Sequence, residues 1–413
     1  MKNCRIIRRV LAVCLSSVML VLSLSGCQGK KQLQNVSLSL WASGNEMALL
    51  NQMIEEFKKE HASEAVFNIT ISQEEENTCK ETVLSNIDGA ADIFFFAGDQ
   101  FGELQRAGAL LEITSGREKI IEDNGGADTA AIDCVSVDNR LYAYPVTASN
   151  GYFLYYNSKY YTEEDVKSFD RLLEIAEENG KKVAMDFGSG WYIYSFFKGA
   201  GFNVEMNDDG KTNSCDWNST DRKYKGTDVA QAMLDIAKHK GFISCGDEAF
   251  VKGVADGTII AGINGTWNSV KVSNAWGENY AAAKLPEYTI AGDSAQMCSF
   301  VGYKLVGVKA STQYPEWAMK LSEWLTSEQN QIKRFQLRGE TPANVNAANS
   351  AEVKKSVAIS ALNEQNEYGY IQNVAQSYWT PTYAFGTTIA ACNRDNKDLQ
   401  KLLDDMQKEI ENK

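Results

Sequence analysis

The stretch Asp92-Ile93-Phe94-Phe95-Phe96-Ala97-Gly98-Asp99 decides the fold. An apolar run of this length, bounded by an acid and a glycine, is typical of a strand buried on both faces. The residues after it predict a short helix that ends at Gly108. Strands of this kind belong to parallel sheets covered by helices, so the stretch predicts an α/β protein.

The chain before and after this strand alternates between two periods. Residues 36–40 and 67–71 alternate apolar with polar side chains, whereas residues 47–57 place apolar side chains at helical spacing. This order predicts strand, helix, strand. The same helical spacing predicts further helices over 162–180, 227–240, 315–325 and 399–410, the first with Thr162 and Asp165 as a capping pair and the third with a first-turn proline.

The N-terminus has the pattern of an export signal. Four basic residues precede an apolar stretch over residues 10–24, which is short for a membrane span. The stretch closes in Leu24-Ser25-Gly26-Cys27, which resembles the lipobox of bacterial lipoproteins. We expect residues 1–26 to be a signal peptide, Cys27 to be lipidated and residues 27–34 to form a tether; an ordinary signal peptide with a chance cysteine is the alternative. The expected location is the extracellular face of the cell membrane, with the lipid as the only anchor.

Length, charge and composition exclude several classes of protein. The 413 residues suggest two or three domains, and the formal charge of −13 disfavours nucleic acid as a partner. The expected signal holds four basic residues and no acid, so the remainder carries −17. With two histidines in the whole chain, a His-rich metal centre is excluded. Six cysteines remain after Cys27 without a CxxC pair, and we expect mostly free thiols.

Catalytic motifs are incomplete. Gly210-Lys211-Thr212 has the end of a P-loop, but Glu205 occupies the first glycine position. Ser195 and Lys198 have the spacing of penicillin-interacting enzymes without the companion motifs of that class. Acidic pairs fall on faces expected to be solvated, and nothing places two carboxylates across a sugar. We therefore predict no catalytic residues, no metal, no cofactor and no enzymatic activity.

Six blocks, in order along nearly the whole chain after the tether, share a pattern with a known family: residues 40–46, 92–114, 141–157, 257–267, 300–302 and 383–384. Together they resemble family 1 of the extracellular solute-binding proteins, the maltose-binding-protein-like lipoproteins that serve ATP-binding-cassette importers. The resemblance implies two α/β lobes, joined by several crossing segments, with the ligand in the cleft between them. It assigns residues 35–144 plus 303–345 to an N-terminal lobe and residues 150–298 plus 346–413 to a C-terminal lobe.

The resemblance also implies which side chains hold the ligand. Sugar rings present flat C–H faces that stack on aromatic rings, and hydroxyl rims that need acids or amides. The implied ligand-binding positions are Asn45, Glu46, Phe96, Asp99, Asn150, Trp191, Tyr192, Trp267 and Trp379. Core packing is the alternative for Phe96, a helix N-cap is the alternative for Asp99, and Trp379 is expected to lie in a loop. The family member compared has tryptophan at Phe96 and arginine at Gln100, so the sugar itself stays open.

The expected function is a monomeric receptor that captures an oligosaccharide by hinge closure and delivers it to the permease subunits of an importer. Maltose and malto-oligosaccharides are the first choice, because the resemblance is to their receptors. The alternatives are a receptor for another oligosaccharide or for a polyamine, which would need several acids between aromatic rings. A surface glycoside hydrolase is a further alternative and requires two essential carboxylates.

Overall fold

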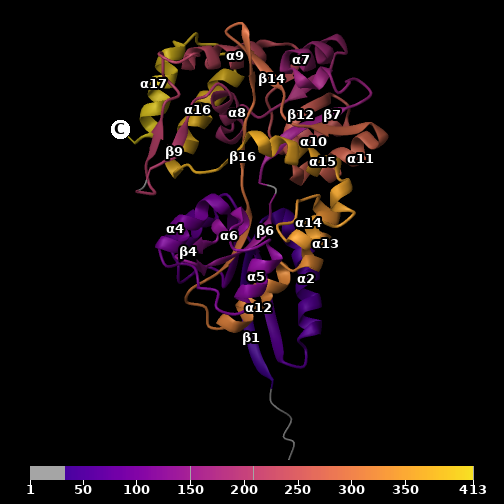
Figure 1. The fold of residues 1–413 in the computed structure, drawn as a ribbon, viewed down its shortest axis with the longest axis vertical. Coiled ribbons are helices and arrows are strands. Elements are labelled where there is room, and N and C mark those ends of the chain that lie inside the picture. Colours follow the sequence, from indigo (N-terminus) through magenta and orange to yellow (C-terminus); the bar gives the residue numbers. More distant parts are fainter. Residues whose placement is uncertain (1–32, 149, 208, 413) are drawn as a thin grey trace, which may run out of the picture.

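The protein consists of two lobes stacked along its long axis (Figure 1). The computed structural model describes residues 33–148, 150–207 and 209–412. The expected signal peptide, the lipidated Cys27 and all but the last two residues of the tether lie outside this part. The first strand begins at Gln34, within the range expected for the tether.

The N-terminal lobe is built on one five-stranded sheet. Strand β1 pairs in parallel with β2 and β3, as the alternation of strand and helix predicts, while β17 runs antiparallel to β3 and to β6. In sheet order the strands are β2 (Ala65–Gln73), β1 (Gln34–Ala42), β3 (Ile93–Ala97), β17 (Lys304–Val308) and β6 (Ala143–Thr147). The helices of this lobe are α2 (Met47–Glu60), α3 (Cys79–Ser85), α4 (Phe101–Arg106), α5 (Arg117–Asp123), α6 (Ala130–Asp133), α12 (Pro315–Leu325) and α13 (Glu328–Arg338), with the short pair β4 (Ser136–Val137) and β5 (Arg140–Leu141).

The C-terminal lobe repeats this plan around a second five-stranded sheet. Its strands, in sheet order, are β11 (Phe242–Ile243), β8 (Lys182–Ala184), β12 (Ile259–Gly265), β7 (Tyr152–Asn157) and β13 (Tyr280–Ala283). Its helices are α7 (Phe169–Glu178), α8 (Gly190–Gly199), α9 (Gly226–Lys238), α10 (Asp247–Ala255), α11 (Ser269–Trp276), α15 (Val357–Gln365), α16 (Trp379–Ala390) and α17 (Leu399–Ile410). Three strand pairs complete it: β9 (Val204–Met206) with β10 (Asn213–Cys215), β14 (Glu287–Ile290) with β15 (Asp293–Gln296), and β16 (Ser299–Val301) with β18 (Gly369–Ile371).

Both sheets are mixed, whereas the sequence predicted a parallel sheet. The connections between the lobes explain the difference. Strand β3 runs toward the other lobe, β17 starts from the crossing that returns from it, and β6 ends at the crossing that leaves for it. Strand β17 begins at a crossing and runs away from the other lobe, whereas β3 and β6 run toward it. Strand β17 is therefore antiparallel to both of these neighbours.

Each lobe has its own buried core. Apolar side chains of residues 36–146 and 305–325 form one cluster, and those of residues 152–300 and 374–410 form the largest cluster of the other lobe. A smaller cluster in the same lobe joins β7 and α10 to α15. The cores do not merge, so the lobes are connected by backbone crossings and surface contacts, which is the arrangement that permits a hinge.

The crossings lie side by side at the waist of the molecule. The Ala148 N–H donates to the Thr341 carbonyl at 2.9 Å, which joins the first crossing to the segment after α13. The Asn150 N–H donates to the Gly302 carbonyl at 3.2 Å, which joins it to the crossing between β16 and β17. The segment after α13 continues through α14 (Val345–Ala348) toward α15. Figure 1 shows these segments passing between the lobes.

Two helix starts differ from the sequence prediction. Helix α7 begins at Phe169, because Ser168 is extended and its hydroxyl accepts the Arg171 N–H as N-cap. The predicted capping pair of Thr162 and Asp165 instead closes the short turn before it. Trp379 begins helix α16 rather than lying in a loop, since a proline in the first turn of a helix removes no needed hydrogen bond.

Candidate functional site

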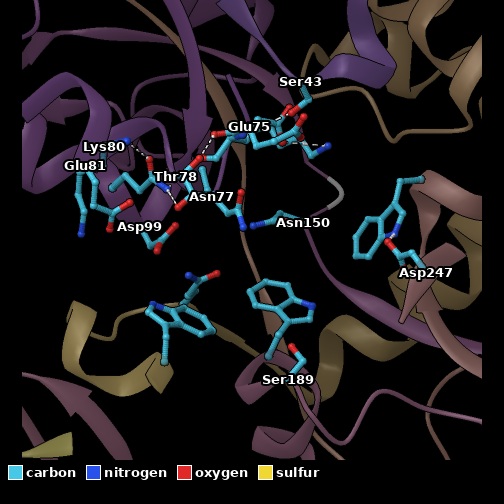
Figure 2. A pocket seen from close by; sticks show the side chains of 18 of the residues that line it. Ser43, Glu75, Asn77, Thr78, Lys80, Glu81, Asp99, Asn150, Ser189 and Asp247 are labelled. Carbon is cyan, nitrogen blue, oxygen red and sulfur yellow. Dashed lines mark hydrogen bonds and ion pairs between the residues drawn. The ribbon is translucent and has the colours of Figure 1, made fainter. Parts of the chain in front are cut away.

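A cavity of about 670 Å³ lies between the lobes and is lined by both of them. Its upper and lower walls in Figure 2 come from different lobes, with Asn150 of the first crossing between them. The volume falls within the range of small-molecule binding sites. Its size and its position at the hinge make it the candidate binding site.

The N-lobe wall is formed by the loops that follow parallel strands. The carboxyl ends of β1, β2 and β3 meet at one edge of the sheet, where ligands of open α/β sheets bind. Ser43 and Asn45 follow β1, Asp99 follows β3, and the segment of residues 75–81 follows β2. Polar side chains predominate in this wall.

The C-lobe wall supplies the aromatic rings. Trp191 and Tyr192 lie in the first turn of α8, Trp267 in the turn η4 (Thr266–Asn268) directly after β12, and Trp379 at the first position of α16. Trp191 packs on Phe300 with ring centroids 5.3 Å apart. The indole rings are therefore held by helix starts and by the core beneath them.

Seven of the nine predicted ligand positions line the cavity. They are Asn45, Asp99, Asn150, Trp191, Tyr192, Trp267 and Trp379. Segments that lie far apart in sequence thus meet around one space. Their role in binding a ligand stays a prediction, which the variants below address.

Phe96 does not reach the cavity, contrary to the prediction. Its side chain is fully buried in the N-lobe core, with its ring 5.9 Å from that of Phe94. Alternate residues of a strand point to opposite faces, but both faces of β3 are covered, so every Phe of the run is core. The chain reaches the cavity only at Ala97.

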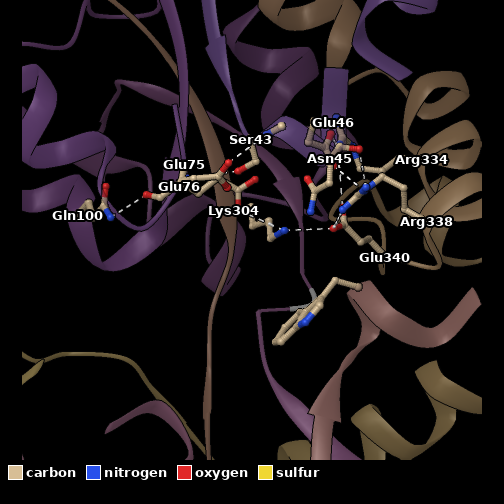
Figure 3. A network of polar contacts seen from close by, with 12 residues as sticks. Ser43, Asn45, Glu46, Glu75, Glu76, Gln100, Lys304, Arg334, Arg338 and Glu340 are labelled. Atoms are coloured by element: carbon tan, nitrogen blue, oxygen red, sulfur yellow. Dashed lines mark hydrogen bonds and ion pairs between the residues drawn. The ribbon is translucent and has the colours of Figure 1, made fainter. Parts of the chain in front are cut away.

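Glu46 also lies outside the cavity. Its carboxylate is 1 % exposed and accepts ion pairs from Arg334 and Arg338 of α13 (Figure 3). Arg338 also pairs with the neighbouring Glu340 at 3.3 Å. Lys304 extends the group, with its Nζ 3.1 Å from Glu340 and 3.2 Å from Glu76. We call these six residues, Glu46, Glu76, Lys304, Arg334, Arg338 and Glu340, the charge cluster.

The charge cluster fixes the N-lobe ends of two crossings. Glu340 directly precedes Thr341, and Lys304 is the first residue of β17 after the crossing from β16. Burial alone would raise the pKa of Glu340, but Lys304, Arg338 and Arg334 hold it well below its ordinary value. The carboxylate is therefore ionised at neutral pH, and its ion pairs tie α13 to β17 below the hinge. Lys304 and Glu76 also face the cavity.

Asp99 is the most perturbed acid of the cavity. Burial raises the pKa of its carboxyl to about 6, against the opposing charge of Lys80. Its Oδ1 atom is buried and has no hydrogen-bond partner within the described residues. Asp99 lies inside the short turn η2 (Gly98–Gln100) and is not the N-cap of the following helix α4, since Gln100 holds that position. A buried acceptor without a partner, next to a cavity, is suited to a ligand hydroxyl.

Residues that the sequence reasoning missed also line the cavity. Asp186 follows β8 and Asp247 begins α10, so both lie where strand ends and helix starts meet the cleft. Gln372 and Gln376 approach from the segment before α16. The position of Asp186 after a strand was the available signal. The two glutamines carry no local pattern, because the crossings bring their segment to the cleft.

Gln100 lines the cavity and supports the neighbouring segment after β2. Its amide nitrogen donates to the carbonyls of Glu76 at 2.8 Å and Asn77 at 3.0 Å, and its oxygen accepts the Lys80 N–H at 3.1 Å. The side chain thereby holds the segment after β2 in place. Because Gln100 is uncharged, the residues that line the cavity include six carboxylates and two lysines but no arginine.

Trp267 is held in one orientation from two sides. Its Nε1–H donates to the Asp247 carboxylate at 2.9 Å. Its six-membered ring covers Gly265 so closely that a Cβ atom there would lie 2.0 Å from the ring. Asp247 is itself fixed by the Asn264 amide at 2.8 Å. A fixed aromatic ring loses little conformational entropy when a ligand stacks on it.

Replacing Gly265 with alanine is expected to displace the Trp267 ring. Residue 265 has φ −99°, which any residue adopts, so the backbone tolerates the change and only the ring must move. We expect ligand affinity to fall about tenfold, with a small change in stability. Titration calorimetry measures the affinity. Gly102→Ala, in helix α4, meets only the end of the flexible Arg106 side chain and changes no cavity wall, so it serves as the stability control; equal affinities of the two variants would contradict the account.

Asp99→Asn is expected to stabilise the ligand-free protein at neutral pH. A folded pKa above the ordinary 3.8 means that the folded state disfavours the charge, so the cost is absent below about pH 4 and complete above about pH 6. We expect a gain of about 1–2 kcal/mol in the free energy of unfolding at pH 7 and none at pH 3.5 or so.

Urea unfolding at both pH values tests this prediction, with the exposed Asp395→Asn as control. An Asp99→Asn gain that persists unchanged at the acidic pH would show that the carboxyl charge is not its source. The same variant should bind ligand more weakly, because a carboxylate accepts stronger hydrogen bonds than an amide.

Comparison with known proteins identifies the class. Residues 52–361 match the family described as bacterial extracellular solute-binding protein. The match covers three quarters of the chain, and the chain belongs to this family. The two-lobed α/β fold with a cleft at the hinge, predicted from the sequence, is confirmed.

Individual relatives show which proteins this chain resembles. The galactooligosaccharide-binding protein of Bacillus subtilis is 27 % identical over 403 residues, which are 91 % of each chain. The maltodextrin-binding protein MdxE of the same organism is 24 % identical and covers 86 % of this chain and 85 % of its own. A solved structure with acarbose is 27 % identical, has a TM-score of 0.79, and covers 92 % of this chain and 99 % of its own. The two Bacillus subtilis relatives are binding proteins.

The described residues offer no candidate metal site. They contain no group of three or more His, Cys, Asp or Glu side chains that could hold a metal ion. The cysteines Cys79, Cys134, Cys215, Cys245, Cys298 and Cys392 are free thiols in this structure. Within the same part of the chain, no helix has the length and apolar character of a membrane span.

Proposed function

We propose that this protein is the receptor of an ATP-binding-cassette importer and captures an oligosaccharide in the interlobe cavity. Malto-oligosaccharides are the first choice and galacto-oligosaccharides the second. The observation that supports this proposal is the difference between the two walls of the cavity. Fixed indole rings of one lobe face acids and amides of the other lobe. Stacking uses the C–H faces of a sugar, and the polar wall takes its hydroxyls.

Capture by hinge closure follows from the same division of the walls. A ligand that contacts both lobes binds the closed arrangement better than the open one, and this differential affinity shifts the population toward closure. The closed form is what a permease would recognise. The receptor acts as a monomer in this proposal, and the sugar is released unchanged because no catalytic step is involved.

A polyamine receptor is the second candidate function, because acids outnumber bases in the lining of the cavity. The lining holds six carboxylates against two lysines, and both lysines are paired with glutamates. Burial and the charge of Asp247 raise the pKa of Asp186, however, and burial raises that of Asp99. These groups are thus easier to neutralise than ordinary acids, which suits neutral hydroxyls better than a permanent cation.

Calorimetric titration of the chain from residue 33 decides among these candidates. The panel contains linear malto-oligosaccharides, galacto-oligosaccharides and spermidine, and chromatography of the sugars after long incubation detects hydrolysis. We expect micromolar or tighter binding of one oligosaccharide series, with the sugar intact. Binding of spermidine alone would establish the polyamine candidate, and shortening of the sugar would establish a glycoside hydrolase.

The lipid anchor is a proposal that rests on the sequence alone. Residues 27–34 would place the first strand, which begins at Gln34, close to the membrane surface. Metabolic labelling with a fatty acid tests it: Cys27→Ser should abolish the label and release the protein into the medium. Label retained in Cys27→Ser would overturn this assignment.

A further inference from the structure

A second cavity adjoins the first on the far side of Trp267. Its volume is about 510 Å³, and it lies between α10, the start of α11 and the end of α13. Asn45, Asp247 and Trp267 line both cavities. The indole that faces the candidate binding site thus also forms a wall of this second space.

The geometry around Trp267 makes the two cavities neighbours rather than separate sites. Trp267 is anchored by Asp247, and the Asn45 carbonyl accepts the Arg338 Nη1–H at 2.8 Å. The three shared residues therefore keep fixed positions at the boundary. A linear ligand that stacks on the indole in the first cavity would reach the second cavity past the edge of the same ring.

The second cavity has the chemistry of a neutral, polyhydroxylated ligand. Val251, Val270 and Leu337 give it apolar surface, and Leu337 is 57 % exposed on the last turn of α13. Its charged lining residues are two acids and two bases, so the cavity has no net formal charge. Apolar surface beside balanced polar groups matches a sugar ring better than a cation or an anion.

Two of these polar groups are available to a ligand. Within the described residues, the side chains of Glu248 and Lys271 make no hydrogen bond or ion pair, whereas Arg338 is paired with Glu46 and Glu340. Lys271 is exposed at the start of α11 and can donate to hydroxyls, and Glu248 in α10 can accept from them.

We propose that the second cavity is an additional sugar subsite, which holds the part of the oligosaccharide that extends past Trp267. This inference rests on the proposed function and adds to it a preference for chain length. The receptor then binds best those chains that are long enough to occupy both cavities. Trp267 contacts the ligand at the junction between them.

A variant that fills the second cavity tests the proposal. Val251→Phe adds a ring inside it, and Val66→Phe adds the same ring at an exposed valine of β2 as matched control. Dissociation constants are measured by calorimetry for one oligosaccharide series, from the disaccharide to the heptasaccharide. Lys271→Ala, which removes an exposed unpaired side chain, is measured in parallel because it leaves the packing intact.

In the native protein we expect affinity to rise with chain length until both cavities are filled. Val251→Phe should weaken the longest ligands about tenfold and leave the shortest binding member within about twofold. Lys271→Ala should act in the same direction with a smaller effect, and Val66→Phe should change nothing. If the native protein binds the series and both cavity variants leave every chain length unchanged, or weaken all equally, the subsite is overturned. If the native protein binds none of the series, the proposed function fails as well.

Discussion

Replacing Arg334 with methionine is expected to lower the free energy of unfolding by about 3–5 kcal/mol. The Arg334 side chain is 2 % exposed and pairs with Glu46 and Glu340, each 1 % exposed. Its guanidinium also lies over the ring of Phe95, 5.8 Å from the centroid. Methionine keeps much of the volume but leaves two buried carboxylates with fewer cations, which is the costly way to break a buried ion pair.

Urea unfolding at pH 7 measures this effect. The matched control is Lys167→Met, which removes an ion pair with Glu164 whose two side chains are 67 % and 83 % exposed. Exposed pairs of this kind contribute about 0–1 kcal/mol, so the control should unfold almost as the native protein does. Similar stabilities of the two variants would show that the charge cluster does not hold the base of the hinge.

Replacing Trp267 with alanine is expected to weaken oligosaccharide binding by about 2 kcal/mol, or roughly thirtyfold. The ring is fixed by Asp247 and Gly265 and faces both cavities. Removal of the indole takes away a stacking surface and leaves the Asp247 carboxylate without the N–H donor of Trp267. The loss should be larger than that of Gly265→Ala, which displaces the ring but keeps it.

Calorimetry with the tightest oligosaccharide measures the loss, and Trp317→Ala is the matched control. Trp317 packs on Phe57 and Phe67 in the N-lobe core, away from the cavity. Its loss should lower stability and leave affinity unchanged. The opposite pattern, with normal affinity in Trp267→Ala and reduced affinity in Trp317→Ala, would show that the Trp267 indole does not contact the ligand.

Local patterns predicted the elements of the fold well. The run of residues 92–97 is a central strand, and Pro315 and Leu399 begin helices as predicted. Such elements depend on periodicity and capping within one segment. The antiparallel strand β17 was not predicted, because its direction is set by a return crossing about 200 residues after its neighbour β3, and that order is not a local property.

The site shows the same limit at the level of single residues. Trp191 and Trp267 were predicted because the resemblance implies stacking rings at their positions, and both line the cavity. Phe96 was misplaced because one apolar run does not show which of its rings faces a cleft. Glu46 was misplaced because its partners, Arg334 and Arg338, follow it by almost 300 residues and only the fold brings them together.

The central claim is that an oligosaccharide binds between the lobes and closes them. Small-angle X-ray scattering of the chain from residue 33, recorded along a titration with the tightest oligosaccharide, tests it most directly. The account predicts that the radius of gyration falls in proportion to the calorimetric occupancy and that Trp267→Ala shifts this fall to higher ligand concentration. Binding with a constant radius of gyration, or a fall that Trp267→Ala leaves in place, would contradict it.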